Sequence, residues 1–385
     1  MQQKGKCLAL GAGAIGKSVS GYIFTQLGFD FRYAEIDDAV ISDINRRGGY
    51  DLYTAVSGDQ IKKQEIRGIC AARVEDAQTA EFAAEADFIV TAVGAANLAA
   101  AAASIAGWVR RRSGQKRLAI LLFENGSGLR ELGEGELRRQ LGSLPAWLSV
   151  SHASIERISK KVVREDGRID GVSEEFIPPI LTRRELADTQ LVLHTEYFEL
   201  ADDVNRYYYR KLYLNNIGHA VLAYLGSKKG YATTLEAVAD DEIQDVLFAV
   251  WDAAGEMVRL KYGFDEQEID EYFAGRLQCY KNAALADPLA RLARSPMRKL
   301  GRHERIIGAA ELCHGYGISL EAFAPVLYCA VNYFSFQDEE SIRLAILKER
   351  KGVEAVLREV CGLDPESELF RQLLQGYIEQ SYRHI

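Results

Sequence analysis

A glycine-rich hexapeptide near the start of the chain, residues 11–16 with the sequence GAGAIG, constrains the fold more than any other feature. It follows the apolar run Cys7–Leu10, which predicts a strand, and opens residues 13–27, whose apolar side chains recur at helical spacing. In such a unit the first glycine permits the tight turn, the second lets the backbone approach a pyrophosphate, and the third lets helix and strand pack closely. The pattern therefore predicts a dinucleotide-binding domain, although a plain strand-to-helix turn would also fit the hexapeptide.

An acidic residue stands where a dinucleotide-binding domain holds the adenosine ribose. Glu35 lies 19 residues after Gly16, near the end of a second predicted strand over residues 31–36. Its carboxylate can accept hydrogen bonds from the ribose hydroxyls. Asp37 and Asp38 follow it and would repel the 2′-phosphate of NADP. These residues favour NAD as the cofactor, and the alternative is a solvated acidic cluster after a strand.

The order of the remaining patterns predicts an α/β fold with a helical C-terminal part. A helix over residues 38–47 and apolar runs at 88–93 and 118–123 continue the alternation of strand and helix that is typical of a doubly wound sheet. Beyond about residue 196, strand signals are scarce, and helical patterns cover residues 207–225, 235–262, 305–312, 320–333 and 366–382. A chain of 385 residues favours two domains. We expect a Rossmann-type dinucleotide-binding domain at residues 1–190 and a mostly α-helical substrate and catalytic domain at residues 191–385.

Composition disfavours several classes of function. The net charge of −8 disfavours a nucleic-acid partner, because polyanion binding depends on Lys and Arg neutralising phosphates. The six cysteines form no CxxC pair and show no zinc-ligand spacing, so we expect reduced thiols, a cytoplasmic location and no metal. His152 and His194 likewise show no ligand spacing. Residues 1–6 do not resemble a signal peptide, and no stretch is apolar enough for a membrane span, so we expect no membrane association.

A second group of polar residues, 211–219 with the sequence KLYLNNIGH, places an amine, two carboxamides and an imidazole on one helical pattern. At about 100° per residue, Asn215 lies about 40° round the helix from Lys211, His219 about 80° and Asn216 about 140°. A lysine with a lowered pKa can act as a general base, and carboxamides can stabilise a developing alkoxide. Helical spacing alone favours Asn215 as the neighbour of Lys211, and a polar helix face on water is the plain alternative.

The pattern Lys211-x4-Asn216-x2-His219 resembles the signature of the polyol-specific long-chain dehydrogenase/reductase family, whose short members are mannitol-1-phosphate 5-dehydrogenases. The resemblance runs through nearly the whole chain. Blocks similar to those of the family lie, in the same order, at residues 11–16, 91–94, 123–125, 155–158, 211–220, 261–264 and 294–300. The resemblance implies the two-part fold described above, an NAD-dependent oxidoreductase that acts on CH–OH groups, and no metal.

The resemblance also implies a role for individual residues. Lys211 would be the general base in polyol oxidation, and Asn216 and Asn125 would hydrogen-bond the reacting oxygen. His219 would orient the substrate or support that network. The cofactor would contact Gly11, Gly13, Ala14, Ile15, Gly16, Glu35, Val93 and Asn125. Lys17, which stands where the family typically has arginine, would keep a positive charge near the phosphates.

The short length favours a phosphorylated substrate, with mannitol 1-phosphate and fructose 6-phosphate as the first pair to consider. The basic residues that would hold the phosphate, in or near the last family-like block, are Arg294, Arg298, Lys299 and Arg305, and a solvated basic face is the alternative. Two other functions stay open: a dehydrogenase or reductase of a non-phosphorylated polyol or hexuronate, and a non-catalytic NAD-binding sensor. We expect a monomer or a small homo-oligomer.

Overall fold

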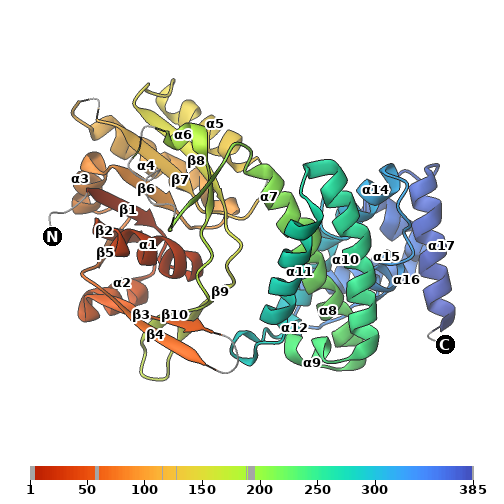
Figure 1. Ribbon diagram of the computed structural model, residues 1–385. Helices are drawn as coiled ribbons and strands as arrows, with labels where there is room; N and C mark the ends of the chain where they lie inside the picture. The colour runs from red at the N-terminus through yellow and green to blue at the C-terminus, as the bar shows by residue number, and fades with distance from the viewer. Residues whose placement is uncertain are drawn as a thin grey trace. The chain divides into compact units, whose positions relative to one another are not determined.

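The computed structural model describes residues 5–56, 60–114, 116–126, 128–187, 189 and 196–383 (Figure 1). The chain divides into two compact units, Met1–Tyr208 and Tyr209–Ile385, here called the N-terminal and C-terminal units. The division falls inside helix α7 (Asn205–Arg210). Within the described residues, no helix is both long enough and apolar enough to cross a membrane.

A mostly parallel sheet forms the centre of the N-terminal unit. Across the sheet, the described strands are β12 (Glu199–Ala201), β11 (Ile180–Thr182), β8 (Leu148–Ser154), β7 (Leu118–Leu122), β6 (Phe88–Thr91), β1 (Lys6–Leu10), β2 (Asp30–Glu35) and β5 (Cys70–Arg73). The six strands from β8 to β5 pair in parallel, and β11 pairs antiparallel with β8. Three strands end slightly earlier than predicted, where the backbone leaves the sheet. Their predicted ranges were residues 31–36, 88–93 and 118–123.

Helices cover both faces of this sheet because successive side chains of a buried parallel strand point to opposite faces. On β1, Cys7 and Ala9 join one apolar core, and Leu8 and Leu10 join the other. The first core includes the helices after the glycine motif, and the second includes the helices after β5, β6 and β7. The described helices of this unit are η1 (Gly16–Gly21), α1 (Tyr22–Gln26), α2 (Asp38–Arg47), α3 (Ala77–Glu85), η2 (Ala95–Asn97), α4 (Leu98–Arg111), α5 (Leu129–Leu141) and α6 (Arg183–Leu186). This arrangement confirms the predicted doubly wound fold.

A second, smaller sheet of the N-terminal unit escaped the sequence analysis. Its described strands, in order, are β4 (Ile61–Arg67), β3 (Gly49–Ala55), β10 (Ile169–Glu174) and β9 (Ser159–Val163). The sheet brings together strands more than a hundred residues apart, since β3 pairs in parallel with β10. It packs against η1, where the Tyr50 hydroxyl donates a hydrogen bond to the carbonyl oxygen of Lys17 at 2.5 Å.

The C-terminal unit is helical, and no strand is assigned among its described residues. Its helices are η4 (Lys211–Asn215), α8 (Asn216–Lys229), α9 (Thr234–Val238), α10 (Asp241–Tyr262), α11 (Glu266–Tyr280), η5 (Ala283–Leu285), α12 (Leu289–Ala293), α13 (Pro296–Lys299), α14 (Ile307–Gly315), α15 (Phe323–Val331), α16 (Glu339–Glu359) and α17 (Glu368–Arg383). The single helix predicted over residues 235–262 is wrong. It is two helices, because the Asp240 carboxylate accepts a hydrogen bond from the Ile243 N–H and starts a new helix there.

Candidate functional site

The glycine turn after β1 has the geometry that a dinucleotide-binding motif requires. Gly11 has φ of +91°, a conformation that favours glycine, and a Cβ there would lie 2.6 Å from the carbonyl oxygen of Ala92. A Cβ on Gly16 would collide with the carbonyl oxygen of Gly11, so only glycine lets helix and strand approach so closely. A Cβ on Gly13 would meet no atom within 4 Å. The space in front of Gly13 is therefore free for a ligand.

The carboxylate of Glu35 is held in front of this turn by main-chain donors. One of its oxygens accepts a hydrogen bond from the Ala12 N–H at 2.7 Å. The other accepts from the N–H groups of Ile36 at 2.7 Å and Asp37 at 3.2 Å. The two oxygens of a carboxylate can accept about four hydrogen bonds, so the oxygen facing the glycine turn can accept one more. The side chain is thus fixed but still able to bind a ribose hydroxyl.

A cavity of about 810 Å³ opens at the carboxyl ends of the parallel strands of the N-terminal unit, which is where α/β sheets bind ligands. Four of the predicted cofactor contacts line it: Gly11, Gly13, Glu35 and Val93. The indole of Trp108 and the side chain of Val74 add apolar wall, as a base-binding pocket requires. The free space at Gly13 and the fixed acceptor on Glu35 fit a bound dinucleotide.

The other predicted cofactor contacts do not line this cavity. Ala14 and Ile15 are half-buried, Gly16 is buried, and Asn125 is exposed directly after Glu124. Ala14, Ile15 and Gly16 begin the helical segment that follows the turn. Main-chain N–H groups at such a position are available to an anion.

Glu124 is a further site residue that the sequence analysis did not single out. Its buried carboxylate accepts hydrogen bonds from the N–H groups of Val93 at 2.9 Å and Gly94 at 2.6 Å. Burial raises the pKa of this carboxyl group, although the two main-chain donors oppose the rise. Glu124 thereby ties the end of β7 to the loop after β6 and fixes Val93 at the edge of the cavity. The family-like Glu-Asn pair at residues 124–125 was the available signal.

Lys17 lies elsewhere than expected. Its side chain is fully buried and does not line the cavity. The ammonium nitrogen lies 4.4 Å from the centre of the Tyr50 ring and has no hydrogen-bond partner in the described part of the chain. Burial lowers the pKa of Lys17 to about 8, although Asp43 and Asp170 oppose the shift. The amine therefore points into the core toward the smaller sheet, because the β3 strand that carries Tyr50 packs against η1.

The predicted catalytic segment contains a π-turn rather than a regular α-helix. Residues Lys211–Asn215 form η4, and the Asn216 N–H donates a hydrogen bond to the carbonyl oxygen of Lys211, five residues back. In an α-helix the acceptor would lie four residues back, so residue i+4 stacks on residue i. A π-turn holds more residues per turn than an α-helix, so each residue advances by less than 100°. The turn therefore brings Asn216 closer to the face of Lys211 than uniform α-helical spacing predicts.

Asn215, the alternative neighbour of Lys211, is turned into the core. It is buried, and its side-chain oxygen accepts a hydrogen bond from the Tyr280 hydroxyl at 3.1 Å. Asn216, by contrast, is half-buried at the start of α8. The two carboxamides therefore differ in exposure: Asn216 is half-buried like Lys211, and Asn215 belongs to the core.

His219 follows Asn216 by three residues on α8, so the two lie on adjacent turns. Its ring packs against Tyr280 with 4.9 Å between ring centres. The surrounding protein lowers the pKa of His219 to about 3, because desolvation outweighs the opposing effect of Asp287 and the cations Arg276 and Arg305 add to it. The imidazole is therefore neutral at physiological pH, with one donor and one acceptor nitrogen.

Of the four predicted phosphate-binding residues, Arg298 and Lys299 lie on the short helix α13, and Arg294 and Arg305 flank it in the sequence. Arg298 and Arg305 both pair with Glu304, at 2.9 and 3.0 Å. Lys299 is buried and donates hydrogen bonds to main-chain carbonyl oxygens, among them that of Arg294 at 2.5 Å. Burial, with Arg305 and Arg298 nearby, lowers the pKa of Lys299 to about 7. Arg294 itself is exposed at the end of α12.

The loop that carries Arg294 has an unusual backbone. Ser295 has φ of +60° and ψ of +58°, and no other described non-glycine residue has a positive φ. Its N–H donates a hydrogen bond to the Asp338 carboxylate at 2.7 Å, which holds the strained turn in place. Such strain is frequent at binding sites.

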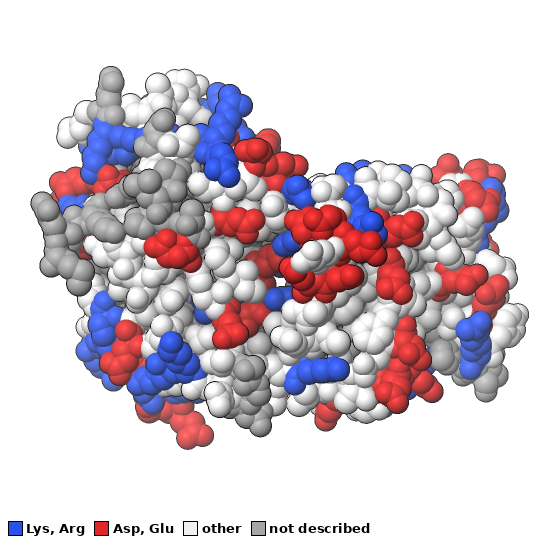
Figure 2. All heavy atoms as spheres, viewed as in Figure 1, with Lys and Arg blue, Asp and Glu red and all other residues white. Residues whose placement is uncertain are grey.

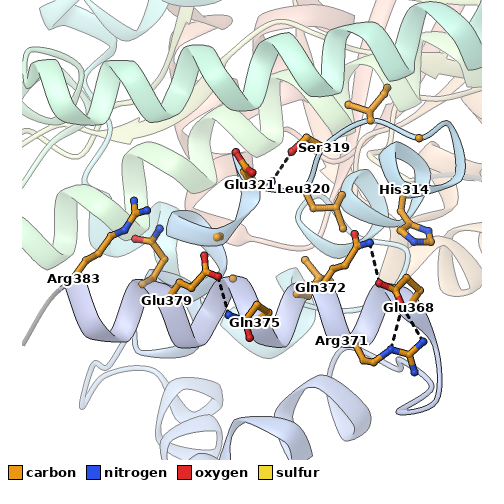
Figure 3. A pocket seen from close by; sticks show the side chains of 16 residues that line it. His314, Ser319, Leu320, Glu321, Glu368, Arg371, Gln372, Gln375, Glu379 and Arg383 are labelled. Atoms are coloured by element: carbon orange, nitrogen blue, oxygen red, sulfur yellow. Dashed lines mark hydrogen bonds and ion pairs between the residues drawn. The ribbon is translucent and has the colours of Figure 1, made fainter.

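Another cavity, of about 960 Å³, lies between α17 and the segment that joins α14 to α15 (Figure 3). The side chains along its α17 wall pair mostly with one another. Gln372 and Arg371 donate to Glu368, and Gln375 donates to Glu379. None of the predicted site residues lines this cavity, so it is not our candidate site.

Two further observations concern ligands and charge. Among the described residues, no group of three or more His, Cys, Asp or Glu side chains is placed to hold a metal ion. His152 is buried in β8, and His194 lies outside the described residues. Acidic and basic side chains are interspersed on the face drawn in Figure 2, as on an ordinary solvated surface.

Comparison with known families decides the classification. Residues 5–170 match the family model described as the mannitol dehydrogenase Rossmann domain, and residues 203–379 match the one described as the mannitol dehydrogenase C-terminal domain. The chain belongs to the mannitol dehydrogenase family. This confirms the resemblance inferred from the sequence blocks, and both units of the chain take part in it.

Relatives within the mannitol dehydrogenase family match nearly the whole chain. A mannitol-1-phosphate 5-dehydrogenase of Bacillus pumilus is 32% identical, over 96% of this chain and 99% of the relative. One of Bacillus subtilis is 30% identical, over 96% and 98%. Mannitol 2-dehydrogenase of Pseudomonas fluorescens, solved as a ternary complex with NAD and D-mannitol, is 16% identical with a TM-score of 0.78, over 99% of this chain and 93% of that one. A D-sorbitol dehydrogenase in substrate-free form is 13% identical with a TM-score of 0.80, over 99% and 94%. The structural likeness confirms the predicted fold class.

Proposed function

We propose that this chain is an NAD-dependent oxidoreductase that interconverts mannitol 1-phosphate and fructose 6-phosphate. The observation that carries the proposal is the similarity to relatives named mannitol-1-phosphate 5-dehydrogenase, at 32% identity over 99% of the length of one of them. The cavity at the glycine turn, with Glu35 fixed beside it, supports NAD as the cofactor.

The proposed mechanism divides the reaction between a hydride and a proton. A bound NAD would supply the acceptor for the hydride that leaves the carbon carrying the reacting hydroxyl. The neutral amine of Lys211 takes the hydroxyl proton, and the carbonyl forms as the C–H bond breaks. The carboxamide of Asn216, one π-turn from Lys211, donates a hydrogen bond to the reacting oxygen and stabilises its negative charge. In the reverse direction, protonated Lys211 returns the proton to the alkoxide.

Two further residues complete the proposed catalytic group. The family resemblance assigns Asn125, in the loop after β7, a hydrogen bond to the reacting oxygen. His219, neutral at physiological pH, can accept a hydrogen bond from one substrate hydroxyl and donate one to another. Neither role requires a metal ion, and a metal-independent reaction is part of the proposal.

We assign the substrate phosphate to the basic residues around α13. The guanidinium groups of Arg294, Arg298 and Arg305 can each clamp a phosphate through two N–H donors. The amine of Lys299 donates to the main chain at Arg294 and holds the loop in shape. The strained turn at Ser295 supports this assignment because it fixes the backbone from which the Arg294 side chain extends.

We also propose a cofactor-binding domain at residues 1–190 and a catalytic domain at 191–385. The proposal further includes a cytoplasmic location and a monomer or small homo-oligomer that binds no nucleic acid. Size-exclusion chromatography with light scattering measures the oligomeric state directly.

A substrate panel tests the function. The purified protein is assayed for NADH formation with mannitol 1-phosphate and with free mannitol, and for NADH consumption with fructose 6-phosphate and with fructuronate. We expect turnover of the two phosphates and at least tenfold lower kcat/KM for the others. Turnover restricted to free mannitol or fructuronate would exclude the phosphorylated substrate. NAD binding without turnover of any compound would favour the sensor instead.

A further inference from the structure

The π-turn at Lys211–Asn215 needs a physical cause. π-helices account for well under 1% of residues in globular proteins, because α-helical hydrogen bonding is more favourable. Where i+5 bonding gives way to i+4 bonding the hydrogen-bond register shifts, and side chains that bind the main chain at such a junction can decide which register forms. In this chain the turn ends at Asn215, where α8 begins.

Two side chains from other helices bind the main chain at this junction. The indole N–H of Trp251, on α10, donates a hydrogen bond to the carbonyl oxygen of Leu214 at 2.9 Å. The hydroxyl of Tyr280, at the end of α11, shares its single proton between the carbonyl oxygen of Asn215 at 3.0 Å and the side-chain oxygen of the same residue at 3.1 Å. The last two carbonyl groups of the turn are therefore both bound by buried aromatic side chains.

Gly218 makes room for both donors. A Cβ at this position would lie 2.7 Å from the Tyr280 hydroxyl oxygen and 3.2 Å from the Trp251 indole nitrogen. Any larger residue would therefore push the two donors away from the turn. The donors are themselves held rigidly, since the Trp251 ring stacks on Phe273 at 4.7 Å and on Tyr280 at 6.0 Å.

We propose that Trp251 and Tyr280 are positioning residues that hold the π-turn and so keep Lys211 and Asn216 on one face of the helix. Only the catalytic consequence of this proposal rests on the proposed function. Without the two donors, the segment returns to α-helical bonding, in which each residue advances by about 100°. Asn216 then lies about 140° from Lys211, and the base and the carboxamide no longer meet at one oxygen.

Variants that remove only the donor atoms test this proposal. Tyr280→Phe removes the hydroxyl but keeps the ring against His219, and Trp251→Phe removes the indole N–H but keeps an aromatic side chain. We expect the double variant to lower kcat about 10- to 100-fold, the cost of misplacing a catalytic group by about 1 Å. The Kd for NAD should stay within twofold of the wild-type value.

A control variant, and the same substitutions in a Lys211→Ala enzyme, distinguish a loss of positioning from a general loss of stability. Tyr377→Phe removes another buried tyrosine hydroxyl, which accepts a hydrogen bond from Asn332 at 3.0 Å, and should leave kcat unchanged at a similar loss of Tm. In a Lys211→Ala background, Trp251→Phe and Tyr280→Phe should lower kcat no further, because the positioned group is already absent. A loss of equal size in both backgrounds would overturn the proposal.

A crystal structure of the double variant tests the register itself, independently of substrate. The proposal expects the Asn216 N–H to bond four residues back, and retention of the bond to Lys211 would overturn it. The kinetic measurements use whichever substrate the wild-type enzyme turns over best. The test therefore remains valid if the substrate proves not to be phosphorylated. An unchanged kcat in the double variant would contradict the positioning role of Trp251 and Tyr280 and would leave the proposed function unaffected.

Discussion

At the scale of single residues, the chemistry depends on a few polar groups whose surroundings differ sharply. Lys211 is half-buried at the first position of the π-turn. Lys17 is fully buried, with its amine over an aromatic ring. His219 is kept neutral by its surroundings. The two lysine residues therefore have different roles: Lys211 belongs to the proposed reaction, and Lys17 belongs to the core.

The role of Lys211 predicts a selective loss of activity. Lys211→Ala should lower kcat by at least about 100-fold, the usual contribution of a positioned general base, while the Kd for NAD stays unchanged. Steady-state kinetics and titration of NAD by calorimetry measure the two effects. Lys228→Ala, which removes an exposed lysine near the end of α8, is the control and should keep wild-type kcat. A Lys211→Ala enzyme with more than a tenth of wild-type kcat would remove Lys211 from its proposed role.

The burial of Lys17 predicts a pH-dependent gain in stability for Lys17→Met. Its pKa is about 8 in the folded state, against 10.5 for a free lysine. Below pH 8 the amine is charged in both states, so the folded state bears the cost of burying the charge, which the substitution relieves. Between pH 8 and 10.5 the folded state loses its proton first, and the cost fades.

Thermal unfolding of both proteins at pH 7 and pH 10 measures this effect. We expect Lys17→Met to stabilise the folded state by on the order of 1–3 kcal/mol at pH 7, since one pKa unit corresponds to about 1.4 kcal/mol. The gain should be clearly smaller at pH 10. An equal gain at both pH values would mean that the charge of Lys17 is not the cause.

At the scale of elements, the proposed cofactor site is built from strand ends and the turns that follow them. The carboxyl ends of β1, β2, β6 and β7 lie at one edge of the larger sheet, because these strands run parallel. Carboxylates tie the turns together: Glu35 binds the glycine turn, and Glu124 binds the loop after β6. The elements therefore fix the site before a cofactor arrives.

The position of Glu35 predicts the choice between NAD and NADP. Glu35→Gln removes the negative charge but keeps the shape of the side chain. We expect kcat/KM for NAD to fall about tenfold, the effect of weakening one charged hydrogen bond, and kcat/KM for NADP to rise. Parallel assays with both cofactors measure the change. Glu75→Gln, at another point of the same cavity, is the control, and an unchanged NAD-to-NADP ratio in Glu35→Gln would contradict the assignment.

At the scale of the whole molecule, the two units differ in architecture and in proposed task. The N-terminal unit carries the cavity for the cofactor, and the C-terminal unit carries Lys211, Asn216 and His219 on one helical segment. The matches to two separate family models, at residues 5–170 and 203–379, follow the same division.

This division predicts a local response to NAD alone. A bound ligand stabilises the state that binds it, by about 2.7 kcal/mol at a hundredfold excess over Kd. Hydrogen exchange should therefore slow at residues 10–16 and 92–97 of the N-terminal unit when NAD is added. Exchange in α14 and α17 of the C-terminal unit should stay unchanged. Slowing confined to the C-terminal unit would place the cofactor elsewhere.

The sequence by itself determined the parts of this protein that local patterns encode. The strand before the glycine turn, the acidic residue after the second strand and the order of helix and strand are fixed by residues close together in the chain. For this reason α2 has the predicted bounds, residues 38–47, and Gly11, Gly13, Glu35 and Val93 line one cavity. The family-like block at Lys211 was equally visible, since its residues lie within nine positions.

Only the tertiary structure decided how those residues are oriented. The segment that begins at Lys211 is a π-turn, and the side chains that bind its end are Trp251 and Tyr280, 37 and 65 residues beyond the carbonyl groups they contact. The smaller sheet and the burial of Lys17 likewise depend on strands that pair across more than a hundred residues. Helical spacing in the sequence assumes one hydrogen-bond register, and contacts from distant helices can change that register.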